Sequence, residues 1–272
     1  MMEQIKATGI TVFHGQNRAV NAADFTLDRG ELVGLVGPNG AGKTSLLRAV
    51  LGLLPASGQC NLLSLDSRRR ARLAAFLPQQ RAVAWALPVE QLIRLGRLPY
   101  QERLFGFATA EADPAAAEQA IQEAIRRMEI SHLRHKPVTE LSGGEVTRVM
   151  IARLLAQQAP FLMLDEPIAG LDPALQLRVM ESLAALARPD TGKSACGVLL
   201  TIHDLGLAAR YCDRLIILHQ GRFVAEGRPL EVLTETVLAE VFGVRAWYQQ
   251  TADGLIFQVT GRQNPATGKA SA

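Results

Sequence analysis

The chain has 272 residues, a net charge of +3 and 48% hydrophobic residues. It can bury a full core, and so small a net charge gives no sign of nucleic-acid binding. The three cysteines, Cys60, Cys196 and Cys212, lack metal-ligand spacing, which predicts reduced thiols in a cytosolic protein. The sequence has no secretory signal and no apolar run of the ~20 residues that a membrane span needs, so any membrane role requires another chain.

The first 36 residues predict β-structure. Residues 10–13 and 23–27 resemble strands, and the apolar run 32–36 predicts a third strand. The aromatic rings of Phe13 and His14 follow one another at the end of the first strand. Either ring can stack on a nucleotide base, although an aromatic side chain in a strand more often contributes to packing.

The loop after the third strand has the form G-x-x-x-x-G-K-[ST] and precedes a helix predicted over residues 45–51. Its glycines let backbone N–H groups turn toward a polyphosphate, and the helix N-terminus adds partial positive charge. Lys43 then reaches the β- and γ-phosphates, and the Thr44 hydroxyl can ligate Mg²⁺. An ordinary glycine-rich turn would not need this strand and helix. We therefore predict a nucleoside triphosphate site made of Gly37, Pro38, Asn39, Gly40, Ala41, Gly42, Lys43, Thr44 and Ser45.

A loop over residues 53–58 and a short helix over 66–75 are predicted next. Residues 74–77 predict a strand that ends just before Gln79. A glutamine at the end of a strand can hydrogen-bond a metal-bound water, although most glutamines only contact solvent.

Residues 84–155 change in character, because apolar residues recur at helical spacing and strand signals are absent. Helices are predicted over 89–98, 113–128 and 145–158, the second with Asp113 as its N-cap. Residues 99–112 predict a linker between the first two of these helices. The segment as a whole predicts a helical subdomain inserted into an α/β core.

The sequence Leu-Ser-Gly-Gly-Glu at 141–145 opens the last of these helices. Ser142 and Glu145 form an S-x-x-E capping box, which explains both residues structurally. It does not explain Gly143 and Gly144, because glycines in a first turn lower helix propensity. Exposed N–H groups without side chains suit an anion, so this helix end also suits a second phosphate contact.

Two apolar runs, 161–164 and 197–202, predict buried parallel strands that end in polar residues. Asp165 can hold Mg²⁺ directly or through water, and Glu166 can orient or deprotonate an attacking water. His203 follows the second strand. Open α/β sheets bind ligands at the carboxyl ends of their strands, so these residues and Gln79 have a common location. Asp172 precedes a proline and can be simply a helix cap.

The remaining sequence predicts a hairpin over 214–225, a helix over 230–242, a second hairpin over 247–260 and disorder over 261–272. The predicted fold is α/β: a phosphate-loop ATPase core of mostly parallel sheet and helices, N-terminal antiparallel β-structure and the inserted helical subdomain. We expect one domain over 1–244, with its core at 1–80 and 156–244 and its helical part at 81–155. A short extension follows at 245–272.

Taken in order, these motifs resemble an ATP-binding cassette (ABC) ATPase over about residues 5–243. The motifs are the phosphate loop at 37–44, Gln79, LSGGE at 141–145, FLMLDE at 161–166, AGLD at 169–172 and His203. LSGGE with its spacing is highly specific. Some departures occur: Val146 and Thr147 follow the signature where polar or basic residues are usual, and His14 stands for a tyrosine. None removes a catalytic group.

The resemblance implies a homodimer that holds two molecules of ATP head to tail. Ser142, Gly143 and Gly144 of one subunit would contact the ATP that is bound by the other subunit's phosphate loop. Asp165 and Thr44 would hold Mg²⁺, with Gln79 sensing the metal. Glu166 would be the catalytic base and His203 the switch on the γ-phosphate, while Asp172 would lie in the loop between the two sites. His14 matches the aromatic residue that stacks on the base, with Phe13 as its alternative.

Finer features resemble the ATPases of bacterial importers for iron–siderophore, haem and vitamin B12. These features are Val89-Glu90, the segment 96–100, the segment 229–233 and the segment 240–244. The resemblance implies a peripheral subunit on the cytoplasmic face of the membrane. Permease subunits would dock near residues 80–105, where Trp85, Leu87, Leu92 and Leu98 offer a groove or form helical core. A solute-binding protein would take part indirectly.

Three alternatives stay open. One is the ATPase of a manganese or zinc importer, which is related. Another is a soluble ABC ATPase that acts on DNA or ribosomes, but such chains usually carry two cassettes or long coiled coils. The last is a phosphate-loop kinase, which would leave LSGGE and His203 unexplained.

Overall fold

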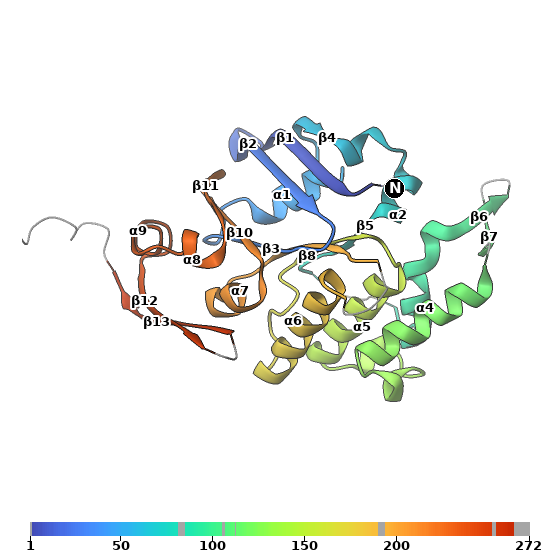
Figure 1. Cartoon of the computed structure of the whole chain (residues 1–272). Helices are drawn as coiled ribbons and strands as arrows, with labels where there is room; N and C mark the ends of the chain where they lie inside the picture. Colours follow the sequence, from blue (N-terminus) through green and yellow to red (C-terminus); the bar gives the residue numbers. More distant parts are fainter. Residues whose placement is uncertain are drawn as a thin grey trace, which may run out of the picture.

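The computed structural model describes residues 2–80, 85–104, 107–111, 113–189, 194–251 and 254–263. Its centre is a six-stranded sheet in the order β11-β10-β3-β9-β8-β5 (Figure 1). All neighbours in this sheet are parallel except β11, which pairs antiparallel with β10. In the same spatial order the strands are β11 (Arg222–Gly227), β10 (Arg214–His219), β3 (Leu32–Val36), β9 (Gly197–Thr201), β8 (Phe161–Asp165) and β5 (Ala74–Leu77).

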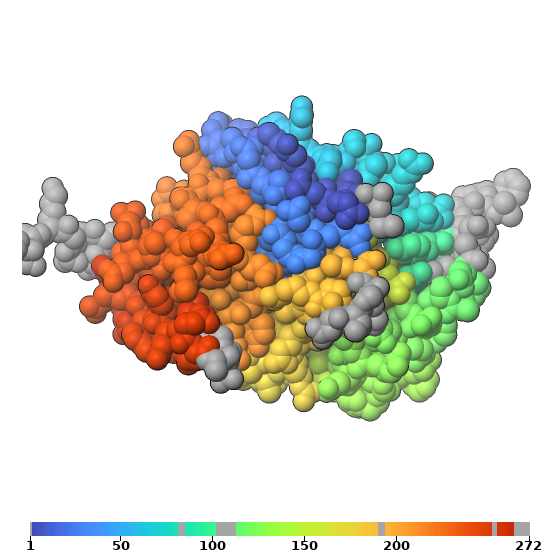
Figure 2. All heavy atoms as spheres, in the orientation of Figure 1, coloured from blue at the N-terminus to red at the C-terminus, as the bar shows by residue number. Residues whose placement is uncertain are grey.

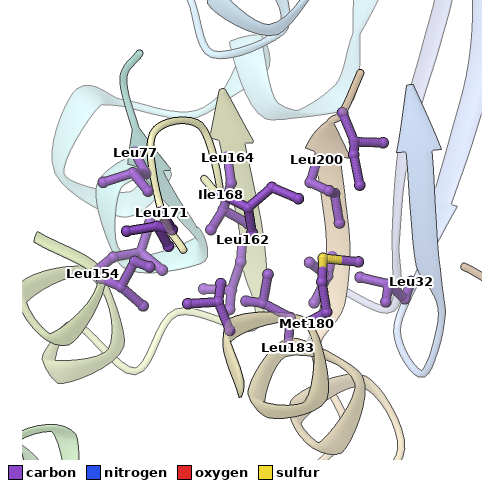
Figure 3. Packing of buried hydrophobic residues seen from close by; sticks show 14 of the residues in the cluster. Leu32, Leu77, Leu154, Leu162, Leu164, Ile168, Leu171, Met180, Leu183 and Leu200 are labelled. Atoms are coloured by element: carbon purple, nitrogen blue, oxygen red, sulfur yellow. The ribbon is translucent and has the colours of Figure 1, made fainter. Parts of the chain in front are cut away.

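The central strands are buried on both faces, which explains their continuous apolar sequences. Successive side chains alternate between the two faces, so that Val33 and Leu35 of β3 join one core and Leu32 and Val36 join the other. Figure 3 shows leucines of several strands facing Met180 of α6. The helices of the core are α1 (Lys43–Val50), α2 (Ser67–Leu73), α6 (Pro173–Ala187) and α7 (Leu205–Tyr211).

A three-stranded antiparallel sheet, in the order β2-β1-β4, packs with α1 in the core that contains Val33 and Leu35. Its strands are β1 (Gln4–His14), β2 (Asn17–Asp28) and β4 (Ser57–Cys60). The prediction of a loop over 53–58 was therefore wrong at its end, because β4 begins at Ser57 and pairs with β1. Three of the four residues of β4 are exposed, so the strand has no apolar alternation to reveal it.

The helical region, α3 through α5, packs against the other face of the central sheet. It contains α3 (Val89–Arg94), the 3-10 segment η2 (Leu95–Tyr100), α4 (Pro114–Arg127) and α5 (Gly143–Ala156). Asp113 caps α4 as predicted, since its side chain accepts a hydrogen bond from the N–H of Ala116. The expectation that this region lacks strands was wrong. The predicted linker contains a hairpin of β6 (Gln101–Leu104) and β7 (Phe107–Glu111).

The predicted helix over 230–242 is also wrong in its continuity. It divides into α8 (Pro229–Val232), α9 (Glu235–Val237) and a π-helical turn, η5 (Leu238–Phe242). Thr234 causes the interruption, because its side chain accepts a hydrogen bond from the N–H of Val237 and so starts a new helix. The smaller 3-10 turns are η1 (Asn61–Ser64), η3 (Ser131–Leu133) and η4 (Val138–Glu140).

The last described element is a hairpin of β12 (Val244–Thr251) and β13 (Gly254–Arg262), as predicted. The disorder predicted over 261–272 was wrong at its start, because Gly261 and Arg262 belong to β13 and pair with β12. The turn at 252–253 and residues 264–272 lie outside the described residues. Figure 2 shows the orange-red C-terminal segment and the green helical region at opposite ends of the molecule, with blue and gold segments meeting between them. Across the described ranges, no helix is both long and apolar enough to cross a membrane.

An ion-pair network joins the parts of the helical region. Glu90 at the start of α3 accepts hydrogen bonds from Arg134, which follows η3, and from Arg94 on its own helix. Arg94 also pairs with Glu118 of α4 at 2.8 Å. Hydrogen bonding to Arg134 lowers the pKa of Glu90, despite the opposing effect of burial. The ionised form of Glu90 therefore stabilises the folded state.

We predict that replacing Glu90 by Gln lowers the thermal midpoint by a few degrees at pH 7. Because the pKa of Glu90 is lower in the folded state, its stabilisation is present above the unfolded-state value and is lost as pH falls through the folded-state value. The difference from wild type should therefore disappear toward acid pH in thermal melts. Glu123→Gln is the control, since Glu123 pairs along its own exposed helix face. If Glu90→Gln lowers the thermal midpoint by the same amount at pH 7 and at acid pH, this prediction is contradicted.

Candidate active site

The phosphate loop connects the end of β3 to the start of α1, as predicted. Two of its glycines are required by the fold. A Cβ on Gly37 would lie 2.0 Å from the carbonyl oxygen of Leu218, and one on Gly42 would lie 2.1 Å from that of Ala19. Gly42 also has a φ of 107°, which disfavours any other residue. The loop is therefore held tightly against the ends of β10 and β2.

Lys43 is 7% exposed and lies under this loop. Its ammonium donates hydrogen bonds to the carbonyl oxygens of Gly37, at 2.7 Å, and Pro38, at 3.0 Å. Burial lowers the pKa of Lys43, and the negative charges of Glu166 and Asp165 partly offset this effect. The loop thus encloses a cation at the place where a polyphosphate is expected.

Asp165 ends β8 and is 1% exposed. Its Oδ1 accepts a hydrogen bond of 2.8 Å from the hydroxyl of Thr201. Its Oδ2 is buried and has no hydrogen-bond partner among the residues that the structure describes. A buried carboxylate oxygen without a partner is costly, and Mg²⁺ in nucleotide sites takes one or two carboxylates together with phosphate oxygens. The donor set at this position therefore fits Mg²⁺.

Glu166 lies beside Asp165 and contacts two of the predicted residues. Its Oε1 lies 2.7 Å from Nε2 of His203, and Gln79 also hydrogen-bonds its carboxylate. Burial acts to raise the pKa of Glu166, but the bonds from His203 and Gln79 and the charge of Lys43 outweigh it, so the pKa lies below its ordinary value. The structure thus brings Gln79, Glu166 and His203 together from three strand ends. The lowered pKa keeps Glu166 ionised, and a proton acceptor must be ionised.

The two candidates for base stacking differ in their contacts. The Nε2 atom of His14 lies 2.9 Å from the hydroxyl of Ser45, in the first turn of α1. The ring of Phe13 is half exposed, and the guanidinium of Arg18 lies over it at 5.3 Å from the ring centre. His14 is therefore connected to the helix that follows the phosphate loop, while Phe13 contacts Arg18.

The signature residues are not part of this cluster within one chain. Ser142 caps α5 in the predicted capping box: its N–H donates to Glu145 at 2.8 Å and its hydroxyl accepts from the Glu145 N–H at 3.3 Å. The helix α5 packs in the core on one face of the central sheet, whereas α1 packs in the core on the other face. Asp172 caps α6 by accepting a hydrogen bond from the Leu175 N–H at 3.0 Å.

Thr201 is a site residue that the sequence reasoning missed. It is fully buried at the end of β9, and its hydroxyl contacts Asp165 and the backbone N–H of Glu166. The only signal in the sequence is a hydroxyl in an otherwise apolar strand, two residues before His203. A strand register is needed to show which residue it faces.

This arrangement of a phosphate loop and acidic strand ends along one edge of a parallel sheet defines a phosphate-loop nucleoside triphosphatase. Within that class, the family described as ABC transporter matches residues 20–169, and the chain belongs to this family. The expected family, fold class and ATPase activity are thereby confirmed. The roles of individual site residues remain predictions.

Two curated relatives and one solved structure illustrate the similarity. Hemin import ATP-binding protein HmuV of Bordetella avium is 40% identical over 255 residues, which cover 89% of this chain and 93% of that protein. Cobalamin import ATP-binding protein BtuD of Halobacterium salinarum is 39% identical over 247 residues, covering 89% of this chain and 59% of that protein. A structure of the ATP-binding subunit of an ABC transporter superposes with a TM-score of 0.72 at 25% identity, covering 84% and 91% of the two chains.

The stacking role of His14 can be tested by two matched substitutions. His14→Phe keeps a flat ring without a hydrogen-bonding nitrogen, while His14→Gln keeps a polar group without the ring. If the ring stacks on adenine, calorimetry should show wild-type ATP affinity for His14→Phe. His14→Gln should then bind about 5- to 150-fold more weakly, the equivalent of 1–3 kcal/mol of stacking. The reverse order of affinities would show that the bond to Ser45 is the important contact.

Proposed function

We propose that this chain is the ATP-hydrolysing, energy-coupling subunit of a bacterial ABC importer. The observation that carries the proposal is the cluster of Gln79, Glu166 and His203 beside the buried carboxylate of Asp165. A kinase that transfers phosphate to a small molecule would have no use for the LSGGE sequence. A soluble ABC ATPase is less well supported, because both curated relatives described above are named import proteins.

The proposed roles follow from the contacts of each side chain. Lys43 exchanges its carbonyl partners for the β- and γ-phosphates, which compensate its charge better than neutral oxygens. Thr44 and the Oδ2 atom of Asp165 would hold Mg²⁺, with Gln79 close to it. Bound Mg²⁺ would supply positive charge to the phosphate oxygens. Glu166 accepts the proton of the attacking water, and His203 hydrogen-bonds the γ-phosphate after leaving Glu166.

The signature glycines support a site shared between two copies of the chain. A Cβ on Gly143 would meet nothing within 4 Å, and one on Gly144 would make ordinary contacts with two leucine side chains. The fold therefore does not require either glycine, although both weaken the start of α5. Their absence of side chains leaves the N–H groups of the first turn open to a phosphate. We propose that this phosphate belongs to ATP on the second subunit of a homodimer.

We predict that Glu166→Gln lowers ATP turnover by about 100-fold or more, because this substitution removes the general base. The same variant should form a dimer when ATP and Mg²⁺ are added, because ATP is retained. Adding Gly143→Ala should abolish that dimer without lowering the thermal midpoint, since alanine has space there and favours helix. Light scattering with and without ATP measures the association.

The Ser142→Ala variant is the matched comparison for stability, because it removes a helix cap and should cost about 1 kcal/mol. Near-normal turnover of Glu166→Gln would contradict the catalytic-base assignment. Dimer formation by the double variant would contradict the shared site.

The solute class is proposed from the relatives and from the segments 96–100 and 240–244. We propose import of iron–siderophore, haem or cobalamin, with manganese or zinc as the alternative. All of these solutes would be recognised by the membrane and solute-binding subunits, so their chemistry is not encoded in the ATP site. The solute-binding protein is an indirect partner.

Permease subunits are proposed to dock near residues 80–105. Trp85 is 74% exposed and Leu98 is 51% exposed, whereas Leu92 is buried in the helical core. The two expectations for this segment therefore each hold for some residues. Leu92 packs α3 into the helical core, whereas Trp85 and Leu98 are available to a partner helix. The chain would then be a peripheral protein on the cytoplasmic face of the membrane.

Co-expression with the permease subunits of neighbouring genes should carry the chain into the membrane fraction. Trp85→Ala combined with Leu98→Ala should reduce this co-sedimentation while the isolated chain keeps its ATP affinity. Leu53→Ala is the control, because Leu53 is also exposed, at 61%, but lies outside the proposed docking segment. A chain that stays in the supernatant with every permease tested would contradict the importer assignment.

A further inference from the structure

The hydroxyl of Thr201 joins the two acidic residues of the site. Thr201 ends β9 and lies opposite Asp165 of β8 in the parallel register. Its Oγ1 donates a hydrogen bond of 2.8 Å to Oδ1 of Asp165 and accepts one of 2.8 Å from the backbone N–H of Glu166. Thr201 is fully buried, so no water competes for either bond. The Oγ1 atom of Thr201 thus contacts both the side chain of Asp165 and the backbone of Glu166.

The first of these bonds orients the carboxylate of Asp165. Because Oδ1 is held by Thr201, the other oxygen, Oδ2, is left as the one without a partner among the described residues. A carboxylate free to rotate would exchange its two oxygens, and neither would be kept ready for a cation. The Thr201 hydroxyl therefore determines which oxygen of Asp165 is presented.

The second bond holds the turn at Glu166. This residue has a φ of 51°, a left-handed conformation that is uncommon for a residue other than glycine. The turn takes Glu166 out of β8 and toward His203 and Gln79. Its N–H would otherwise be an unpaired donor next to a buried strand, and the Thr201 hydroxyl accepts it. The same atom therefore stabilises the conformation that aims the Glu166 side chain.

We propose that Thr201 is a positioning residue for ATP hydrolysis, which rests on the roles proposed above for Asp165 and Glu166. Thr201 touches neither nucleotide nor metal in this assignment. It acts through one hydroxyl, which presents Oδ2 of Asp165 to Mg²⁺ and holds the turn that places Glu166 against the attacking water.

The test compares Thr201→Val with Thr201→Ser in the full chain. Valine has nearly the shape of threonine and lacks the hydroxyl, whereas serine keeps the hydroxyl and loses a methyl group. In Thr201→Val, kcat for ATP should fall about 10- to 100-fold, as expected when reacting groups are slightly misplaced. The gain in affinity for a non-hydrolysable ATP analogue on adding Mg²⁺ should also be lost, while its affinity in EDTA stays unchanged. Thr201→Ser should bring both quantities back close to wild type.

Equal impairment of the serine and valine variants would overturn the proposal, since packing and not the hydroxyl would then matter. Wild-type kcat and a wild-type Mg²⁺ effect in Thr201→Val would overturn it too. If valine prevents folding, Thr201→Ala also lacks the hydroxyl without added bulk, and the same results are expected of it. Asp165→Asn and Glu166→Gln are measured in parallel. If Asp165→Asn loses the Mg²⁺ effect and Glu166→Gln loses turnover while Thr201→Val keeps both, the role of Thr201 alone fails. If Asp165→Asn and Glu166→Gln are also unimpaired, the site assignment itself fails.

Discussion

Burial of the central parallel strands on both faces is the constraint on which the active site depends. A strand buried on both sides cannot shift by one residue without exchanging its two sets of packed side chains. The pairing of β8 with β9 is therefore fixed, and it places Thr201 opposite Asp165. The same constraint brings the ends of β5 and β3 to this edge of the sheet, so Gln79 and the phosphate loop arrive beside the carboxylates.

Charge balance at this edge follows from the positions of three groups. Lys43, Asp165 and Glu166 are buried or half-buried, and each would be costly to ionise alone. The cation of Lys43 interacts with both carboxylates, and Glu166 gains hydrogen bonds from its neighbours. Among these three groups, however, the Oδ2 atom of Asp165 has no hydrogen-bond partner in the described part of the chain. A site with this residual imbalance is suited to receive a cation with its nucleotide.

The start of α5 presents a different case, because local structure explains only part of its sequence. The capping box accounts for Ser142 and Glu145, because two hydrogen bonds join these residues, which are close in the sequence. Neither Gly143 nor Gly144 is needed for packing. Because the fold does not require these glycines and they weaken the helix that they begin, we explain them by a contact with a molecule outside the chain. For this reason the phosphate loop is proposed to be one half of a site.

The sequence by itself determined the features that depend on neighbouring residues. The apolar runs at 32–36 and 74–77 are strands with the predicted bounds, and Asp113, Ser142 and Asp172 cap helices, because strand burial and capping are written in short segments. Tertiary structure alone decided the pairing of β4 with β1, the hairpin of β6 with β7 and the contact of Thr201 with two acidic residues. These contacts depend on which strands become neighbours and in which register they pair. The sequence of a single apolar strand does not show which residue of another strand each side chain will face.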